Sequence, residues 1–247
     1  MTGIGDYIVD AVNRKKIHFS LLDPDKQSPE RAGKIAAEVT AVGSSAIMVG
    51  GSTLSNPRQV DETVKAIKDN SDLPVILFPS GARFLSRFAD AVFFMSLLNS
   101  RNLDFVIREH VKGSLMIQKF GIEPISMGYV IVEPGMTAGR VGEADLIKQD
   151  DIETAVGYAL ASEYLGMRLF YLEAGSGATQ PVSDEMIRGI KKSVRVPLVV
   201  GGGIRDEVTA KKKIQAGADV IVTGTALEKD PNAYCTLKNI ISVIEAG

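Results

Sequence analysis

The chain has 247 residues, of which 45% are hydrophobic, and its 28 Lys and Arg nearly balance its 30 Asp and Glu. A net charge of −2 without a basic run argues against a nucleic-acid-binding protein, because such proteins neutralise phosphates with clustered Lys and Arg. The apolar runs are too short to cross a bilayer, and the N-terminal segment lacks the apolar block of a signal peptide. The single cysteine excludes an internal disulfide, and we expect a cytoplasmic protein.

Eight short, mostly apolar segments predict strands that are buried on both faces, as in a parallel sheet covered by helices. In chain order they are residues 17–22, 45–49, 74–78, 90–95, 124–132, 168–173, 196–200 and 219–223. Segments of helical periodicity alternate with them at 28–42, 57–69, 101–120, 150–165, 183–193, 206–216 and 232–245. The expected helix N-caps include Asp150, Ser183, Asp206 and Asn232. This α/β alternation predicts one (β/α)₈ TIM-barrel domain over residues 1–247.

Two connections depart from the regular pattern. The third and fourth predicted strands begin only 16 residues apart, so we expect the third helix to be short or missing. The segment between Val132 and Asp150 is longer than an ordinary connection, and loops of that length are usually lids or binding loops. The Phe- and Met-rich segment 91–98 is expected to be core, with its end forming the start of an apolar trough at the barrel mouth.

Glycine-containing segments follow the last three predicted strands, at the end of a barrel where ligands bind. They are residues 174–178, 201–205 and 224–226. Glycine removes the side chain that would hold a phosphate away from backbone N–H groups, and a following helix N-terminus favours negative charge. Each segment alone also fits a tight turn, but three at adjacent strand ends predict a phosphate site. Their spacings match neither the dinucleotide-binding nor the P-loop pattern.

Oxygen-bearing side chains follow the first, second and sixth predicted strands. Asp23 and Asp25 flank a proline and Ser52 follows two glycines, which suits Mg²⁺ bridging to a substrate phosphate; the alternative is a turn capped by aspartates. Glu173 ends an apolar strand beside Tyr171. It is a candidate base, because burial would raise its pKa toward the working range. The alternative is a structural carboxylate that accepts hydrogen bonds from loop amides.

The motifs LDPDK (22–26), GGST (50–53), YLEAGSG (171–177), GGGIR (201–205) and GTA (224–226) together resemble geranylgeranylglyceryl phosphate synthases. The wider family includes bacterial heptaprenylglyceryl phosphate synthases. The resemblance covers essentially the whole chain. It implies a prenyltransferase that joins C1 of geranylgeranyl diphosphate to the 3-hydroxyl of sn-glycerol 1-phosphate and releases diphosphate, which forms the first ether bond of archaeal-type membrane lipids. A longer donor such as heptaprenyl diphosphate is the near alternative.

The resemblance also implies roles for individual residues. Asp23 and Ser52 would bind Mg²⁺, and Glu173 with Tyr171 would be catalytic. The implied substrate-binding residues are Tyr171, Leu172, Glu173, Ala174, Gly175, Ser176, Gly177, Gly202, Gly203, Gly224 and Thr225. Many members have Lys two residues before the first Asp, where this chain has Leu21. The long segment after the fifth strand is typical of the family's second group, which implies a homo-oligomer, dimer or hexamer, with peripheral membrane contact through the lipid substrate.

Two other functional classes share a phosphate-binding barrel. A phosphosugar isomerase would need a second acid or base, which is not evident, and it should work without Mg²⁺ or prenyl diphosphate. A non-catalytic phosphate-binding barrel would keep the glycines but need neither Asp23 nor Glu173, and it should release no product. The fold cannot decide among these classes, because barrels support many chemistries.

Overall fold

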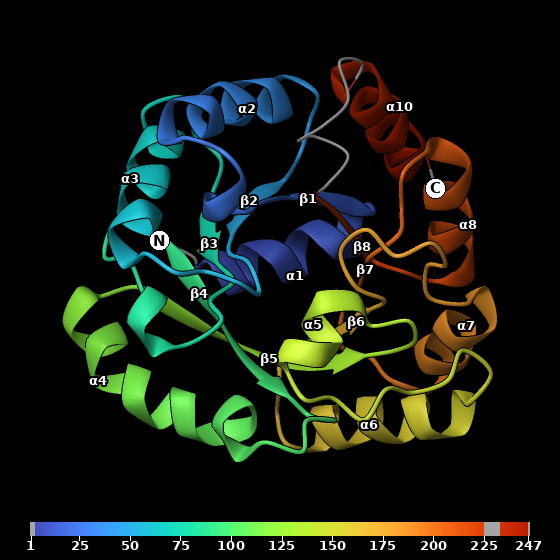
Figure 1. The fold of residues 1–247 in the computed structure, drawn as a ribbon. Coiled ribbons are helices and arrows are strands. Elements are labelled where there is room, and N and C mark those ends of the chain that lie inside the picture. Colours follow the sequence, from blue (N-terminus) through green and yellow to red (C-terminus); the bar gives the residue numbers. More distant parts are fainter. Residues whose placement is uncertain (1–2, 225–232, 247) are drawn as a thin grey trace.

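The computed structural model describes residues 3–224 and 233–246, and these form a closed barrel of eight parallel strands arranged in chain order (Figure 1). The strands are β1 (Ile17–Leu22), β2 (Ala46–Val49), β3 (Val75–Leu77), β4 (Ala91–Leu97), β5 (Glu123–Ile131), β6 (Leu169–Glu173), β7 (Leu198–Gly201) and β8 (Val220–Thr223). Pairing of β1 with β8, which sets Ile17 opposite Val220, closes the barrel. The predicted TIM barrel is confirmed.

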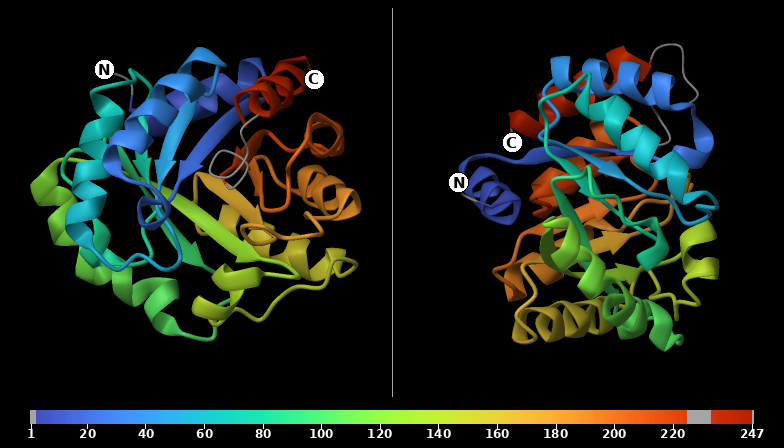
Figure 2. Two further views of the ribbon diagram at one scale, coloured as in Figure 1. Left: turned by 45° about the horizontal axis from the view of Figure 1, so that its top comes forward. Right: turned by 90° about the vertical axis from the view of Figure 1, so that its left-hand side faces the viewer.

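Helices cover the outside of the barrel and both of its ends. They are α1 (Ile4–Arg14), α2 (Pro29–Ala41), α3 (Pro57–Lys68), α4 (Glu109–Phe120), α5 (Met136–Val141), α6 (Ile152–Tyr164), α7 (Asp184–Ser193), α8 (Glu207–Ala216) and α10 (Ala233–Glu245). Figure 2 shows α1 and α5 at opposite ends of the barrel. None of the described helices is long and apolar enough to cross a membrane.

The structure differs from the predicted elements in three places. The sequence pattern missed α1 and α5, which cover the two ends of the barrel rather than its sheet and therefore interrupt the strand–helix alternation. The N-cap of α6 is Asp151 instead of Asp150, because the Asp151 side chain accepts the N–H of Thr154. Ser183 and Asp206 cap their helices as predicted. Asn232 lies outside the described residues.

The third connection is short, as predicted. Between β3 and β4 the chain forms only a 3₁₀ turn, Ala82–Phe84, in the place of a full helix. In the next connection a π-helical turn, Asp104–Arg108, runs directly into α4. The missing helix leaves α4 packed against the 3₁₀ turn, and this arrangement forms one wall of the trough described below.

Alternate strand residues divide into an inner and an outer core. Phe19, Phe93 and Tyr171 are among the side chains that fill the barrel, whereas Leu172 and Ile221 belong to the layer between strands and helices. Since both faces are buried, the strands are almost uniformly apolar, as their continuous hydrophobic runs predicted.

His18 is an exception, because it is a polar residue within the outer core. It is fully buried, with Nδ1 2.7 Å from Ser44 Oγ and Nε2 2.9 Å from Thr223 Oγ1. Burial lowers the pKa of His18 from 6.5 to about 3, so the imidazole is neutral near pH 7.

Candidate active site

Glu173 is the last residue of β6, and its buried carboxylate stands at the barrel mouth. The Tyr171 hydroxyl donates to Oε2 at 2.7 Å and the Gly175 N–H donates to Oε1 at 2.6 Å. Burial raises the pKa of Glu173, while these two donors partly oppose the rise. A carboxylate oxygen can accept more than one hydrogen bond, so Glu173 can receive a further donor. Holding a loop amide and acting as a base are therefore compatible roles.

The glycines at the end of β7 make room for this carboxylate. A Cβ at Gly202 would lie 2.3 Å from Glu173 Oε1, and one at Gly201 would lie 2.3 Å from the Tyr171 hydroxyl oxygen. Gly202 also has φ of +85°, which other residues rarely adopt. The sequence pattern connected these glycines only with phosphate; the structure adds that they accommodate the Tyr171–Glu173 pair.

A cavity of about 350 Å³ opens above this pair. Its lining residues are Leu21, Tyr171, Glu173, Ser176, Gly177, Gly202, Gly203, Ile204, Arg205, Val222, Thr223, Gly224 and Thr236. Seven of the substrate-binding residues implied by the resemblance are thus brought together: Tyr171, Glu173, Ser176, Gly177, Gly202, Gly203 and Gly224. Glycine-bordered loops with free space between them are suited to bind a phosphate.

Three of the remaining implied residues do not line the cavity. Leu172 and Ala174 are fully buried in the outer core, and Gly175 packs against Gly135. Thr225 lies outside the described residues. Among the lining residues that sequence analysis missed is Thr236, which comes from α10 and belongs to no motif, so only the tertiary structure brings it to the cavity.

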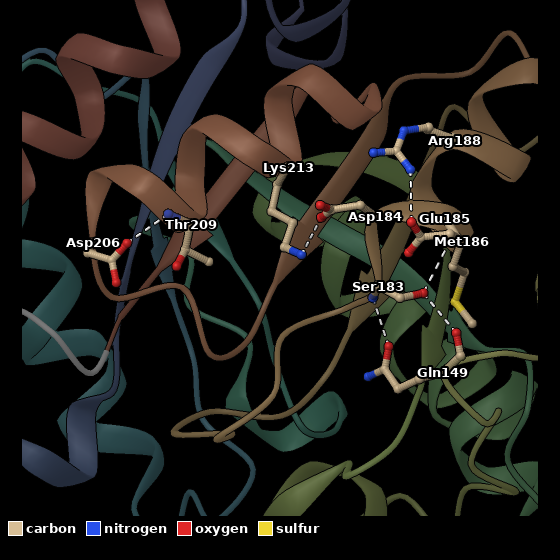
Figure 3. A network of polar contacts seen from close by, with 9 residues as sticks. All are labelled: Gln149, Ser183, Asp184, Glu185, Met186, Arg188, Asp206, Thr209 and Lys213. Carbon is tan, nitrogen blue, oxygen red and sulfur yellow. Dashed lines mark hydrogen bonds and ion pairs between the residues drawn. The ribbon is translucent and has the colours of Figure 1, made fainter.

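The loop after β6 is fixed at two points. Arg205 Nη2 donates to the carbonyl oxygens of Gly177 at 2.7 Å and Ala178 at 3.0 Å. At its far end, Ser183 caps α7, donates through Oγ to the Gln149 carbonyl at 2.8 Å, and donates its N–H to Gln149 Oε1 at 2.7 Å (Figure 3). The loop is therefore preorganised around the cavity rather than dependent on a ligand for its shape.

Asp23 and Ser52 lie at the neighbouring ends of β1 and β2. A Cβ at Gly51 would come within 2.5 Å of the Asp23 carboxylate, which places the residue before Ser52 directly against Asp23. The carboxylate accepts the Asp25 N–H at 3.1 Å and lies 3.4 Å from Lys26 Nζ. Burial and the charge of Asp23 raise the pKa of the Asp25 carboxyl. A carboxylate and a hydroxyl are hard oxygen ligands that fit Mg²⁺, which keeps several waters when it binds protein.

An apolar trough of about 120 Å³ begins beside Ser52 and extends toward α4. Its lining residues are Gly51, Ser52, Phe78, Pro79, Ser80, Gly81, Ala82, Leu85, Val92, Phe93, Phe94, Met95, Leu97, Phe105, Glu109, His110, Gly113, Ile117, Tyr129, Ile131, Ala138, Val141 and Gly142. The expected trough at the end of segment 91–98 is thus present. The long segment after β5 contributes to the lining of this trough through α5.

Residues 10–244 match the family model described as the PcrB family. The chain belongs to this family. It is 56% identical over 223 residues to geranylgeranylglyceryl phosphate synthase of Pyrococcus horikoshii, a match that covers 90% of this chain and 88% of that protein. The synthase of the same name from Picrophilus torridus is 51% identical, with 96% and 98% of the two chains covered.

A crystal structure gives a further match to the PcrB-family chain. It shows (S)-3-O-geranylgeranylglyceryl phosphate synthase from Thermoplasma acidophilum in complex with its substrate sn-glycerol-1-phosphate, and it has a TM-score of 0.97, 44% identity and 100% coverage of both chains. The resemblance to geranylgeranylglyceryl phosphate synthases is confirmed, as is the prediction of a prenyltransferase.

Leu21 is the point at which this PcrB-family chain departs from the lysine expected from the resemblance. Its apolar side chain lines the cavity and therefore brings no positive charge to it. Arg205 also lines the cavity, with its guanidinium bonded to the loop after β6. Among the described residues that line this cavity, the cationic side chain is thus that of Arg205, from the loop after β7.

Proposed function

We propose that the chain transfers the geranylgeranyl group from its diphosphate to the 3-hydroxyl of sn-glycerol 1-phosphate. The observation that carries this proposal is the position of a glycine-lined cavity with a buried carboxylate beside an apolar trough. The cavity suits a phosphate attached to a short polyol, and the trough suits a hydrocarbon chain. The acceptor is further supported by the sn-glycerol-1-phosphate complex of the Thermoplasma acidophilum synthase, and the donor by the names of the relatives.

The acceptor is held by its phosphate among the loops that contain Gly177, Gly203 and Gly224. This leaves its 3-hydroxyl free to donate to Glu173, which takes the proton as the hydroxyl oxygen bonds to C1 of the donor. Tyr171 holds the carboxylate in position through its 2.7 Å hydrogen bond. Fixing the hydroxyl near C1 converts a bimolecular encounter into a positioned reaction.

Asp23 and Ser52 would hold the magnesium ion, and the bound ion supplies stabilisation of the negative charge on the departing diphosphate. The Asp23 carboxylate is buried against Gly51, so it is oriented before any ligand arrives. The same end of the trough therefore receives the diphosphate, and the prenyl chain extends from it toward α4.

A longer prenyl donor such as heptaprenyl diphosphate would react by the same chemistry. The depth of the trough decides between this donor and geranylgeranyl diphosphate. An isomerase of phosphosugars has no use for an apolar trough, so this observation favours prenyl transfer.

The test is product formation from geranylgeranyl diphosphate and Mg²⁺ with sn-glycerol 1-phosphate, its sn-3 enantiomer or no acceptor. Ether product with the sn-1 acceptor only is the expected result. If geranylgeranyl diphosphate gives no product but heptaprenyl diphosphate does, the longer donor is correct. If neither donor gives product, the proposed function is wrong.

We also propose that the chain forms a homo-oligomer through α4. Leu103, Ile107, Val111 and Leu115 are 51–76% exposed and recur every fourth residue along one face, which we call the α4 stripe. Four-residue spacing drifts by about 40° per step on an α-helix, and the wider π-helical turn at 104–108 offsets this drift. A two-fold antiparallel pairing of two α4 stripes would bury these apolar side chains.

A further inference from the structure

Three aromatic rings stand between the trough and the cavity. Phe78 and Tyr129 line the trough, and Tyr171 lines the cavity. Their ring centroids are mutually close: 5.5 Å for Phe78–Tyr129, 5.7 Å for Phe78–Tyr171 and 5.2 Å for Tyr129–Tyr171. We call these three residues the aromatic junction. A donor in the trough and an acceptor beside Glu173 meet at this junction, because it is the boundary that the two spaces share.

The junction keeps its rings uncharged. Tyr129 and Tyr171 are buried, and burial together with the nearby Glu173 raises both phenol pKa values well above their usual range. A phenolate here would itself be a nucleophile for the donor, whereas a neutral phenol offers the same face as Phe78. The electron-rich face of such a ring attracts a cation within about 6 Å of its centroid, and the attraction grows when water is excluded.

The chemistry of the donor supplies that cation. When an allylic C1–O bond to diphosphate lengthens, positive charge develops on the allylic carbons. Among the described residues that line the trough, the other groups able to titrate are Glu109 and His110. The Glu109 carboxylate already accepts the Ala82 N–H at 2.7 Å and pairs with Lys112. Burial lowers the pKa of His110, which is edge-on to Phe94 at 4.4 Å. Neither group belongs to the aromatic junction. Among the described residues that line the trough, the aromatic rings are therefore the groups that can stabilise positive charge at C1 of the donor.

We propose that Phe78 and Tyr129 are catalytic residues whose rings stabilise the allylic cation at C1. This inference rests on the proposed function. In the step, the C1–O bond of the donor breaks and its electron pair leaves with diphosphate. An oxygen lone pair of the glycerol 3-hydroxyl forms the new bond to C1, and the hydroxyl proton passes to Glu173.

The first test compares Tyr129→Leu with Tyr129→Phe, which keeps the ring and loses only the hydroxyl. Loss of a desolvated cation–π contact lowers kcat about thirtyfold in the Leu variant, and the Phe variant, which keeps the ring, loses much less kcat than the Leu variant. The KM for the donor changes little in both, because the ring acts on the cation and not on the uncharged prenyl chain. Phe78→Leu, at the less buried ring, is the second variant if Tyr129→Leu fails to fold.

The second test uses two donor analogues in binding experiments. Geranylgeranyl thiolodiphosphate is uncleavable and carries no positive charge at C1, whereas a geranylgeranyl ammonium ion bound with inorganic diphosphate carries a cation there. We expect Tyr129→Leu and Phe78→Leu to weaken binding of the ammonium analogue about thirtyfold and to leave binding of the thiolodiphosphate nearly unchanged. Equal weakening of both analogues would mean that the rings serve only as a wall, which overturns the inference.

The outcomes separate this inference from the proposed function. If the wild-type chain forms no ether product from any prenyl donor, the proposed function fails. If the wild type is active and folded Tyr129→Leu and Phe78→Leu keep its kcat, the transferase assignment stands and the catalytic role of the rings is wrong.

Discussion

Gly202 and Glu173 are so close that only glycine fits beside the carboxylate. A Cβ at Gly202 would lie 2.3 Å from Glu173 Oε1, 2.7 Å from the Gly175 nitrogen and 2.9 Å from the Ala174 nitrogen. These contacts involve backbone atoms and a carboxylate fixed by two hydrogen bonds, so the neighbours cannot move aside cheaply. The glycines at the end of β7 therefore help to position the Glu173 carboxylate.

Gly202→Ala should therefore lower the catalytic rate more than the addition of a single methyl group would suggest. The added methyl group displaces the Glu173 carboxylate, and the positive φ of Gly202 adds backbone strain of about 1 kcal/mol or more. We expect a loss of kcat of at least about a hundredfold. The matched control is Gly157→Ala, where a Cβ meets nothing within 4 Å and the position is helical, so stability should rise slightly. Wild-type kcat in a folded Gly202→Ala variant would contradict the prediction.

Glu173→Gln should lower turnover about 10²- to 10⁴-fold, because the amide cannot accept the proton of the acceptor hydroxyl. Binding of sn-glycerol 1-phosphate, measured by calorimetry, should persist because the phosphate loops are untouched. In the wild type the rate should rise with pH through the raised pKa of Glu173, since only the ionised form acts as a base. Turnover of Glu173→Gln at the wild-type rate would show that another group takes the proton.

Asp23→Asn should change the dependence on Mg²⁺ rather than the affinity for glycerol phosphate. The amide oxygen is a weaker ligand without the negative charge, so we expect a higher Mg²⁺ concentration for half-maximal rate. The measurement is a Mg²⁺ titration of kcat for both proteins, with Asp10→Asn on α1, at the opposite end of the barrel from α5, as the control. An unchanged titration curve in a stable Asp23→Asn protein would remove the metal assignment.

His18 should make the fold sensitive to acid. The unfolded chain takes up a proton on His18 below pH 6.5, whereas the folded chain does so only near pH 3. Stability is therefore lost as the pH falls from 6.5 toward 3, by up to about 1.4 kcal/mol per pH unit from this group. In His18→Gln the amide can donate and accept hydrogen bonds with Ser44 and Thr223, but it takes up no proton as the pH falls. Urea unfolding at several pH values should show a shallower acid dependence in the variant, and an equal slope would contradict this reasoning.

Val111→Glu should dissociate the proposed oligomer. The substitution places a charge within the apolar α4 stripe, where Val111 is 68% exposed, so pairing would bury that charge without a partner. Sedimentation analysis should give a smaller assembly for this variant than the dimer or hexamer expected for the wild type. The control is Val208→Glu on α8, which is 60% exposed and lies across the barrel from α4 (Figure 1). A monomeric wild type would rule out the proposed interface.

The sequence alone determined the barrel and most of the site. Eight apolar runs alternate with capped helices, and parallel strands bring all their carboxyl ends to one mouth. Asp23 and Ser52 follow such strands and Glu173 ends one, so the location of all three at the same end of the barrel was predictable from the sequence.

Tertiary structure decided what depends on distances between residues far apart in the chain. Three features depend on such distances: the contact of Gly202 with Glu173, the position of Thr236 of α10 at the cavity, and the aromatic junction. Each joins elements that are separate in the sequence pattern. The two helices at the barrel ends, α1 and α5, were not predicted. The strand–helix alternation indicates only the strands of the sheet and the helices that cover it. Local pattern thus specifies which residues reach the mouth, while packing of neighbouring strands specifies which atoms touch.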